Sequence, residues 1–244
     1  MIQATQFGLS ERQVAALNKR FEGAAPQDLL RWALEIFGRR IAFAWSGAED
    51  VAVLDMMWRI DPKAARVFTL DTGRLNPETY DVISAVQRRY GIEVEIQFPE
   101  AAAVEQIVRE RGVNLFYNSI ENRKLCCGAR KVEPLKRMLA QLDGWITGLR
   151  RTQAVTRTAL ARIEIDHAFG GIIKLNPLAN WTTQQVFDYI KAHGVPRTKL
   201  HEQGYPSIGC APCTRAVRLG EDERAGRWWW ESPESKECGL HVKK

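Results

Sequence analysis

The stretch Ile41-Ala-Phe-Ala-Trp45, followed at once by Ser46-Gly47, decides the fold class. A short apolar run bounded by turn residues predicts a buried strand. Helical spacing follows from Glu49 to Ile60, and a second apolar run, Ala65-Arg-Val-Phe-Thr-Leu70, stops at Asp71-Thr-Gly73. Strand, helix and strand in this order form the unit of a parallel sheet with crossover helices.

The same alternation extends outward from this unit. Ser10-Glu-Arg-Gln13 is a capping box, and Thr182 to Gln185 offers another. We expect further helices at 26–37, 77–90, 101–111 and 128–141, and further strands at 92–96, 144–147 and 171–175. The fold class is therefore α/β, a doubly wound, mainly parallel sheet with helices on both faces. We assign residues 1–217 to the α/β domain and residues 218–244 to a flexible C-terminal tail.

The composition limits the class of protein. Of 244 residues, 45% are hydrophobic and 26% are charged, which excludes general disorder and a small disulfide scaffold. The net charge of +6 suits an anionic ligand, but the basic residues are scattered among acids, so we expect no nucleic-acid partner. The sequence shows no signal peptide and no apolar run of about 18 residues, so we expect a cytoplasmic protein without a membrane partner.

The five cysteines divide into two close pairs and one single residue. The pairs are Cys126-Cys127 and Cys210-Ala-Pro-Cys213, and Cys238 stands alone near the end of the sequence. Four thiols in two close pairs indicate a metal site. From the residues alone, zinc and an iron–sulfur cluster both remain possible, as do unliganded buried cysteines. Lys131 follows the first pair and would offset negative charge there.

Two βα turns and the tail carry the remaining chemistry. Backbone N–H groups at Ser46-Gly47 could hold an anion at a helix N-terminus, and the turn at Thr72-Gly73-Arg74 should lie at the same sheet edge. Both segments could equally be plain turns. Cys238 near the chain end would be a reactive thiol where cations lower its pKa, and Arg224, Arg227 and His241 would supply them.

Taken together, these segments resemble the assimilatory adenylylsulfate (APS) reductases, within the wider group of phosphoadenylylsulfate (PAPS) reductases. The matching segments are Ser46-Gly-Ala-Glu-Asp50, Leu70-Asp-Thr-Gly-Arg74, the two cysteine pairs and Glu237-Cys-Gly-Leu-His241. The resemblance implies a PP-loop-type adenine-nucleotide fold. It also implies reduction of APS to sulfite and AMP, with thioredoxin as the reductant, in sulfate assimilation and cysteine biosynthesis.

The resemblance also implies the roles of individual residues. Cys238 would be the nucleophile and would carry the sulfonate as a thiosulfonate. Cys126, Cys127, Cys210 and Cys213 would ligate a [4Fe–4S] cluster. The substrate would be bound by Ser46, Gly47, Thr72, Gly73, Arg74, Lys131, Gly148, Arg151, Arg224, Arg227 and His241.

The resemblance also bears on the partners of the protein and on its alternative functions. The reductant would be a separate, transiently bound thioredoxin, because the sequence contains no thioredoxin-like segment. Homo-oligomers are possible. One alternative is a PAPS reductase, which the cluster cysteines disfavour. The others are a PP-loop iron–sulfur tRNA sulfurtransferase and a non-catalytic zinc or electron-transfer module.

Overall fold

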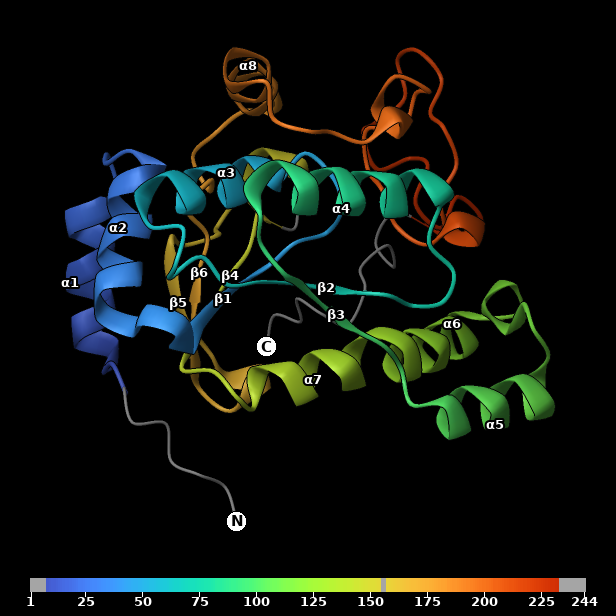
Figure 1. Cartoon of the computed structure of the whole chain (residues 1–244). Helices are drawn as coiled ribbons and strands as arrows, with labels where there is room; N and C mark the ends of the chain where they lie inside the picture. The colour runs from blue at the N-terminus through green and yellow to red at the C-terminus, as the bar shows by residue number, and fades with distance from the viewer. Residues whose placement is uncertain (1–7, 155–156, 233–244) are drawn as a thin grey trace. The chain divides into compact units, whose positions relative to one another are not determined.

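The computed structural model describes residues 8–154 and 157–232 (Figure 1). These residues form two compact units, each assembled from separate stretches of the chain. The first unit comprises 8–69, 81–95 and 139–198, and the second comprises 70–80, 96–138 and 199–232, apart from the two undescribed residues. Each unit is described here by itself.

The first unit carries a six-stranded sheet in the order β3-β2-β1-β4-β6-β5. Its strands are β1 (Ile41–Ala44), β2 (Val67–Leu70), β3 (Val94–Gln97), β4 (Gly144–Ile146), β5 (Ile163–Asp166) and β6 (Ile172–Leu175). β1 pairs in parallel with β2 and with β4, and β4 pairs in parallel with β6. Among the strand pairs described, only β5 and β6 pair antiparallel. The predicted α/β, mainly parallel sheet is confirmed.

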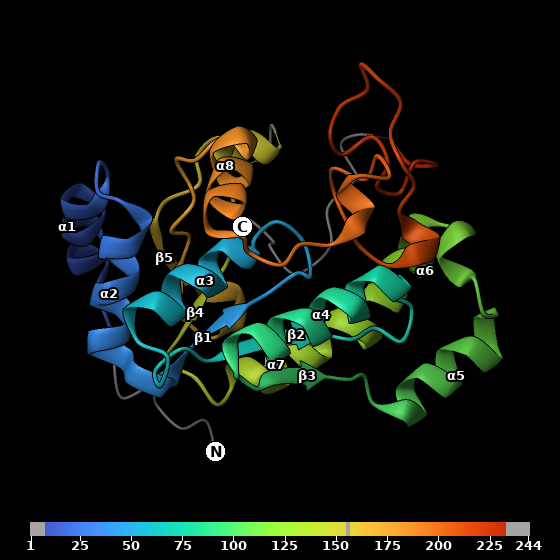
Figure 2. The same ribbon diagram turned by 45° about the horizontal axis from the view of Figure 1, so that its top comes forward.

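The helices of the first unit pack through apolar stripes. They are α1 (Glu11–Phe21), α2 (Pro26–Phe37), α3 (Val51–Ile60), most of α4 (Pro77–Tyr90) and α8 (Thr183–His193). α2 contacts β1 and α3, and α3 also contacts α8 (Figure 2). Their inward residues join the strands in one core, which includes Leu29, Phe43, Leu54 and Leu175, none of them more than 1% exposed. Burial of this apolar surface is the main stabilising contribution to the unit.

The second unit is built from short helices and turns. It contains α5 (Ala101–Arg111), α6 (Ile120–Cys127), a π-helical turn (Gly128–Val132) and most of α7 (Glu133–Leu139). Three-residue 3-10 turns lie at Leu115–Tyr117, Lys199–His201 and Ala211–Cys213. Its small apolar core comprises Ile107, Leu115, Phe116, Cys126, Cys213 and Trp228. Two of the metal-ligand candidates are therefore core residues of this unit.

Both predicted capping boxes are confirmed. The Ser10 hydroxyl accepts from the Gln13 N–H at 3.3 Å, and the Gln13 side chain accepts from the Ser10 N–H at 2.8 Å. Thr182 and Gln185 make the same reciprocal pair at α8. No helix in the described part of the chain is long and apolar enough to cross a membrane.

The structure contains local elements that the sequence did not predict. The helix predicted over 128–141 is confirmed from Gly128 to Leu139, with a π-helical first part at Gly128–Val132, whereas α6, which precedes it, was not predicted. α6 has little apolar periodicity because Arg123 and Cys126 are its buried residues, so a search for an apolar stripe misses it. β5 was also missed. The segment after Gly194 contains 3-10 turns and a bridge between Thr214 and Arg227, where only loops were expected.

Arg162 provides a test of how the first unit holds its helices. Its buried guanidinium donates to the carbonyl oxygens of Phe21, Ala24 and Pro177, the last at 3.1 Å. Arg162→Met removes these donors and should lower the free energy of unfolding by about 3 kcal/mol, the usual result of leaving buried acceptors unpaired.

The measurement is urea unfolding followed by circular dichroism. The matched control is Arg31→Met, which breaks an ion pair with Asp28 whose two side chains are each 53% exposed. That change should alter stability by less than about 0.5 kcal/mol. Equal effects of the two substitutions would contradict the role given to Arg162.

Candidate functional site

A pocket in the second unit brings the four paired cysteines together. Cys126, Cys127, Cys210 and Cys213 line it, with four cationic side chains and two other residues, Arg74, Arg123, Arg130, Lys131, Phe116 and Pro212. All four thiols are free of disulfide bonds. The pocket thus combines sulfur donors with positive charge. Lys131 was predicted beside the cysteines, whereas Arg74 was predicted in the nucleotide pocket.

The local backbone explains how each cysteine reaches the pocket. Ser119 caps the N-terminus of α6, because its hydroxyl accepts from the Asn122 N–H at 3.1 Å, and the helix ends with Cys126 and Cys127. The wider turn that follows carries Arg130 and Lys131, which also line the pocket. Such π-helical turns are frequent at functional sites because they re-aim side chains.

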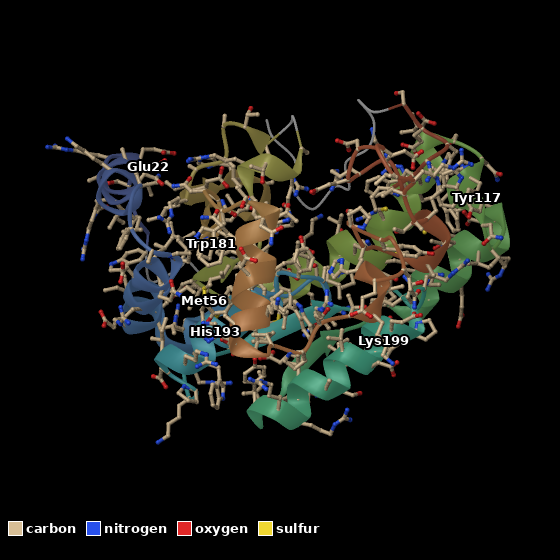
Figure 3. The ribbon with its side chains drawn as sticks, turned by 90° about the horizontal axis from the view of Figure 1, so that it is seen from above. Glu22, Met56, Tyr117, Trp181, His193 and Lys199 are labelled. Carbon is tan, nitrogen blue, oxygen red and sulfur yellow. The ribbon has the colours of Figure 1, made fainter. Side chains whose placement is uncertain are left out.

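The second cysteine pair is held by backbone hydrogen bonds. The Ala211 N–H donates to the Arg74 carbonyl at 2.8 Å, and the Cys213 N–H donates to the Cys210 carbonyl at 2.9 Å. Tyr117, labelled in Figure 3, donates its hydroxyl to the Pro212 carbonyl at 2.6 Å. The Cys-Ala-Pro-Cys turn is therefore fixed from both sides within its own unit.

The electrostatics of the pocket differ from thiol to thiol. Burial raises the pKa of Cys213 to about 12, and the neighbouring Cys210 sulfur adds to that rise. Burial also opposes ionisation of Cys210, but the Lys131 ammonium and the Thr72 hydroxyl outweigh it and lower the pKa of Cys210. A bound metal would need all four as thiolates, so nearby cations favour binding.

The four thiols are candidate ligands for a metal ion or for an iron–sulfur cluster. Among the described residues, no three His, Cys, Asp or Glu side chains converge on one metal-ion position. A cluster with separate iron corners would be held by four cysteine thiolates. Cys126, Cys127, Cys210 and Cys213 line one pocket together with four cationic side chains.

The predicted nucleotide segment 72–74 lies at this pocket. Thr72 Oγ1 is 3.2 Å from Cys210 Sγ, and Arg130 donates to the Thr72 carbonyl at 2.6 Å. Arg74 lines the pocket and donates to Asn114 Oδ1 at 2.9 Å. A Cβ on Gly73 would lie 3.4 Å from the Arg130 guanidinium. The segment therefore contacts the cysteine site directly.

The tail residues predicted for the sulfate are only partly described. Arg227 is buried, donates to the Ile208 carbonyl at 2.8 Å and lies over the Trp228 ring. Arg224 is partly exposed. Cys238 and His241 lie outside the described residues.

In the first unit, the turn at Ser46-Gly47 is organised around Asp50. The Asp50 carboxylate accepts from the Ser46 N–H at 2.9 Å, from the Ser46 hydroxyl at 2.8 Å and from the Ala48 N–H at 3.3 Å. The sequence predicted outward-pointing N–H groups, but these two are directed at a buried side chain. Gly47 has φ +80°, which favours glycine.

Gly148 and Arg151 have identifiable structural roles in the same unit. A Cβ on Gly148 would lie 2.2 Å from the Asp50 Cβ, so only glycine fits there. Arg151 donates to the Leu160 carbonyl at 2.8 Å and to Glu22 at 3.0 Å. These contacts hold the segment that was predicted to bind the nucleotide.

Several pocket and turn residues were not singled out from the sequence. Arg123 and Phe116 line the cysteine pocket, and Arg150 forms a buried ion pair with Glu49 at 2.7 Å in the first unit. Arg123 lies three residues before Cys126, so recognition of α6 would have placed both on one helical face. The pairing of Arg150 with Glu49 spans 101 residues and has no local signal.

Comparisons with known proteins give a consistent result. Residues 40–216 match the phosphoadenosine phosphosulfate reductase domain. An adenosine 5'-phosphosulfate reductase of Burkholderia cepacia is 57% identical over 72% of this chain and 70% of its own. A probable chloroplastic 5'-adenylylsulfate reductase of Oryza sativa is 46% identical over 93% of this chain, which spans 49% of that protein.

A solved structure supports the same relationship. A phosphoadenylyl-sulfate reductase from Candida auris, in a phosphate complex, superposes with a TM-score of 0.74 and 31% identity. The superposition covers 86% of this chain and 99% of that one.

Asp50 gives a pH-dependent prediction. Burial, together with the charge of Glu49, raises its pKa from 3.8 to about 7, although the Ser46 and Ala48 donors oppose the rise. Between these values the native state binds more protons than the unfolded state, so stability falls as pH rises, by on the order of 1 kcal/mol per pH unit.

Asp50→Asn cannot ionise and should flatten this dependence between pH 5 and pH 7, roughly the window set by the two pKa values. Urea unfolding of both proteins across that window measures it. An unchanged slope in the variant would show that Asp50 titrates near its ordinary pKa.

The fit around Gly148 gives a second prediction. Gly148→Ala forces its new methyl group against Asp50 and should cost about 1–3 kcal/mol of stability, the usual range for overpacking. The matched control is Gly23→Ala, because a Cβ at Gly23 meets nothing within 4 Å. Thermal unfolding should separate the two variants, and an equally stable Gly148→Ala protein would contradict the close approach.

Proposed function

This chain belongs to the phosphoadenosine phosphosulfate reductase family, and we propose that within it the protein is an adenylylsulfate reductase. Its substrate would be APS and its products sulfite and AMP, in sulfate assimilation and cysteine biosynthesis. The observation that carries this choice is the pocket in which four free thiols and four cations meet. Relatives named as adenylylsulfate reductases support it at 46–57% identity.

We propose that Cys126, Cys127, Cys210 and Cys213 hold a [4Fe–4S] cluster. When bound, the cluster would supply electrostatic polarisation of the substrate next to it. Lys131 and Arg74, which line the same pocket, would offset the negative charge of the thiolates and of an anionic substrate. The Ser46-Gly47 turn, with Gly148 and Arg151, is proposed to bind the nucleotide.

The reaction would proceed by nucleophilic catalysis at Cys238. Its thiolate attacks the sulfur of APS, an S–S bond forms, and the S–O bond to AMP breaks with the electron pair leaving on the AMP phosphate. Cys238 then carries a thiosulfonate. Arg224, Arg227 and His241 are proposed to offset the repulsion between the thiolate and the sulfate, which both carry negative charge.

A thiol of reduced thioredoxin would complete the cycle. It attacks the Cys238 sulfur, sulfite leaves with the S–S electron pair, and a mixed disulfide forms. The second thioredoxin thiol resolves this disulfide, so that Cys238 is released as a thiol and thioredoxin is oxidised. We propose that this partner binds transiently, that residues 218–244 act as a tail that delivers Cys238, and that the protein is cytoplasmic.

PAPS reduction is the second candidate function. It is favoured by the family description and by the likeness to the Candida auris phosphoadenylyl-sulfate reductase. A PAPS reductase must also accommodate a 3'-phosphate. Steady-state turnover on APS and on PAPS, measured side by side with one thioredoxin, distinguishes the two candidates.

Cys238→Ser tests the proposed chemistry. A serine hydroxyl is a far weaker nucleophile than a thiolate at neutral pH, so sulfite release should fall by roughly 10³-fold or more. The covalent adduct, followed by mass spectrometry, should disappear. The visible absorbance of the anaerobically purified protein should stay at the wild-type level, because Cys238 is not a proposed ligand.

The matched control is Cys126→Ser, which alters a proposed ligand. It should lower the visible absorbance and the iron content. Sustained APS reduction by Cys238→Ser would overturn the mechanism, and unchanged iron in Cys126→Ser would overturn the ligand assignment.

A further inference from the structure

Trp228 has an unfavourable backbone conformation. Its φ is +39°, and it is the one non-glycine residue with positive φ in the described part of the chain. A bulky side chain in this region costs on the order of 1–3 kcal/mol and persists only where the surroundings hold it. Trp228 is also 1% exposed. A strained, buried residue of this kind marks a position that the surrounding contacts determine.

Those contacts come from three parts of the second unit. The Trp228 N–H donates to the Cys213 carbonyl at 3.1 Å. The guanidinium groups of Arg123 and Arg227 lie 4.7 Å and 4.6 Å from its ring centroid. Cation–π contacts of desolvated groups are stronger than exposed ones. Trp228 is therefore tied both to the Cys210–Cys213 turn and to α6.

Arg123 makes a second connection to the same segment. Its Nε donates to Glu231 Oε1 at 2.5 Å, and the two side chains are only 1% and 4% exposed. A buried ion pair of this kind is weak evidence for stability, but breaking it leaves an uncompensated charge. We therefore assign to the Arg123–Glu231 ion pair the role of fixing the position of the backbone at Glu231.

The Arg123–Glu231 ion pair links the helix that carries Cys126 and Cys127 to the part of the chain that precedes Cys238. Arg123 lies one helical turn before Cys126 on α6, and it lines the cysteine pocket. Glu231 lies seven residues before Cys238. A chain of that length reaches at most about 25 Å, so the position of Glu231 limits where Cys238 can go.

We infer that Arg123 is a positioning residue. Together with Glu231 and Trp228, it anchors residues 228–231, here called the tail root because they precede Cys238, to α6, the helix that carries Cys126 and Cys127. This inference rests on the proposed function for the role of Cys238. The anchor itself rests only on the contacts within the second unit. Its effect would be on delivery of the thiol and not on substrate affinity.

The experiment uses the full-length, cluster-loaded protein and two variants. Glu231→Gln keeps the shape of the side chain and removes its charge. The double variant Arg123→Met/Glu231→Leu replaces the buried pair by apolar groups, a change that is often neutral for stability. The matched control is Arg137→Met, which breaks an ion pair with Glu100 in the same unit, away from the tail root.

Three quantities are measured for each protein. They are the single-turnover rate of adduct formation on Cys238 at saturating APS, the equilibrium affinity for APS in the Cys238→Ser background, and the visible absorbance. We expect both anchor variants to form the adduct on the order of tenfold to a hundredfold more slowly, the effect of a small misplacement of a reacting group. Affinity and absorbance should stay near wild type in Glu231→Gln, which leaves all four pocket cations in place, and Arg137→Met should match wild type throughout.

A fourth measurement is independent of the substrate. Amide hydrogen exchange at 228–232 should accelerate in both anchor variants, while exchange in α7 stays unchanged. Wild-type adduct rates in both variants, or a loss that appears only in substrate affinity, would overturn the inference. If the wild-type protein forms no adduct with APS, the proposed function fails, and the exchange at 228–232 alone then decides whether the anchor exists.

Discussion

The second unit depends on one electrostatic constraint, because four thiols share one pocket and their ionisation would place several negative charges close together. Each thiol would become an anion on binding a metal, and burial opposes that ionisation, as the raised pKa of Cys213 shows. Cationic side chains from separate segments line the same pocket. They are Lys131 and Arg130 from the π-helical turn, Arg74 from a βα turn and Arg123 from α6. Burial opposes ionisation of Cys210 as well, but Lys131, the Thr72 hydroxyl and Arg227 outweigh it and lower the pKa of Cys210.

The same requirement explains the irregular backbone of the unit. A regular helix through 120–139 would distribute its side chains evenly, whereas the π-helical turn at Gly128–Val132 brings Arg130 and Lys131 to the pocket beside Cys126 and Cys127. The strained backbone of Trp228 is held by the Cys213 carbonyl and by two guanidinium groups over its ring. Irregularity is concentrated where the chemistry is proposed, as strain in proteins commonly is.

In the first unit, the polar interactions described here stabilise turns and do not compensate the charge of a thiol cluster. Asp50 collects the N–H groups of Ser46 and Ala48, and Gly148 packs so closely on Asp50 that no side chain fits there. Next to it, Arg150 and Glu49 pair in the interior. Residues that the family resemblance assigns to ligand binding, such as Ser46 and Gly148, thus have structural roles of their own.

Local sequence signals determined the sheet strands β1 and β2, the capped helices α1 and α8, and the grouping of cysteines into two pairs, because each depends on neighbours within a few residues. Apolar runs, capping boxes and close cysteine spacing are all of this kind. Only the tertiary structure decided that Arg123 faces the cysteines, that Thr72 meets Cys210, and that Glu231 pairs with a helix 108 residues earlier. Such contacts join distant segments, and their partners are chosen by packing and burial, for which a single sequence carries no local signal.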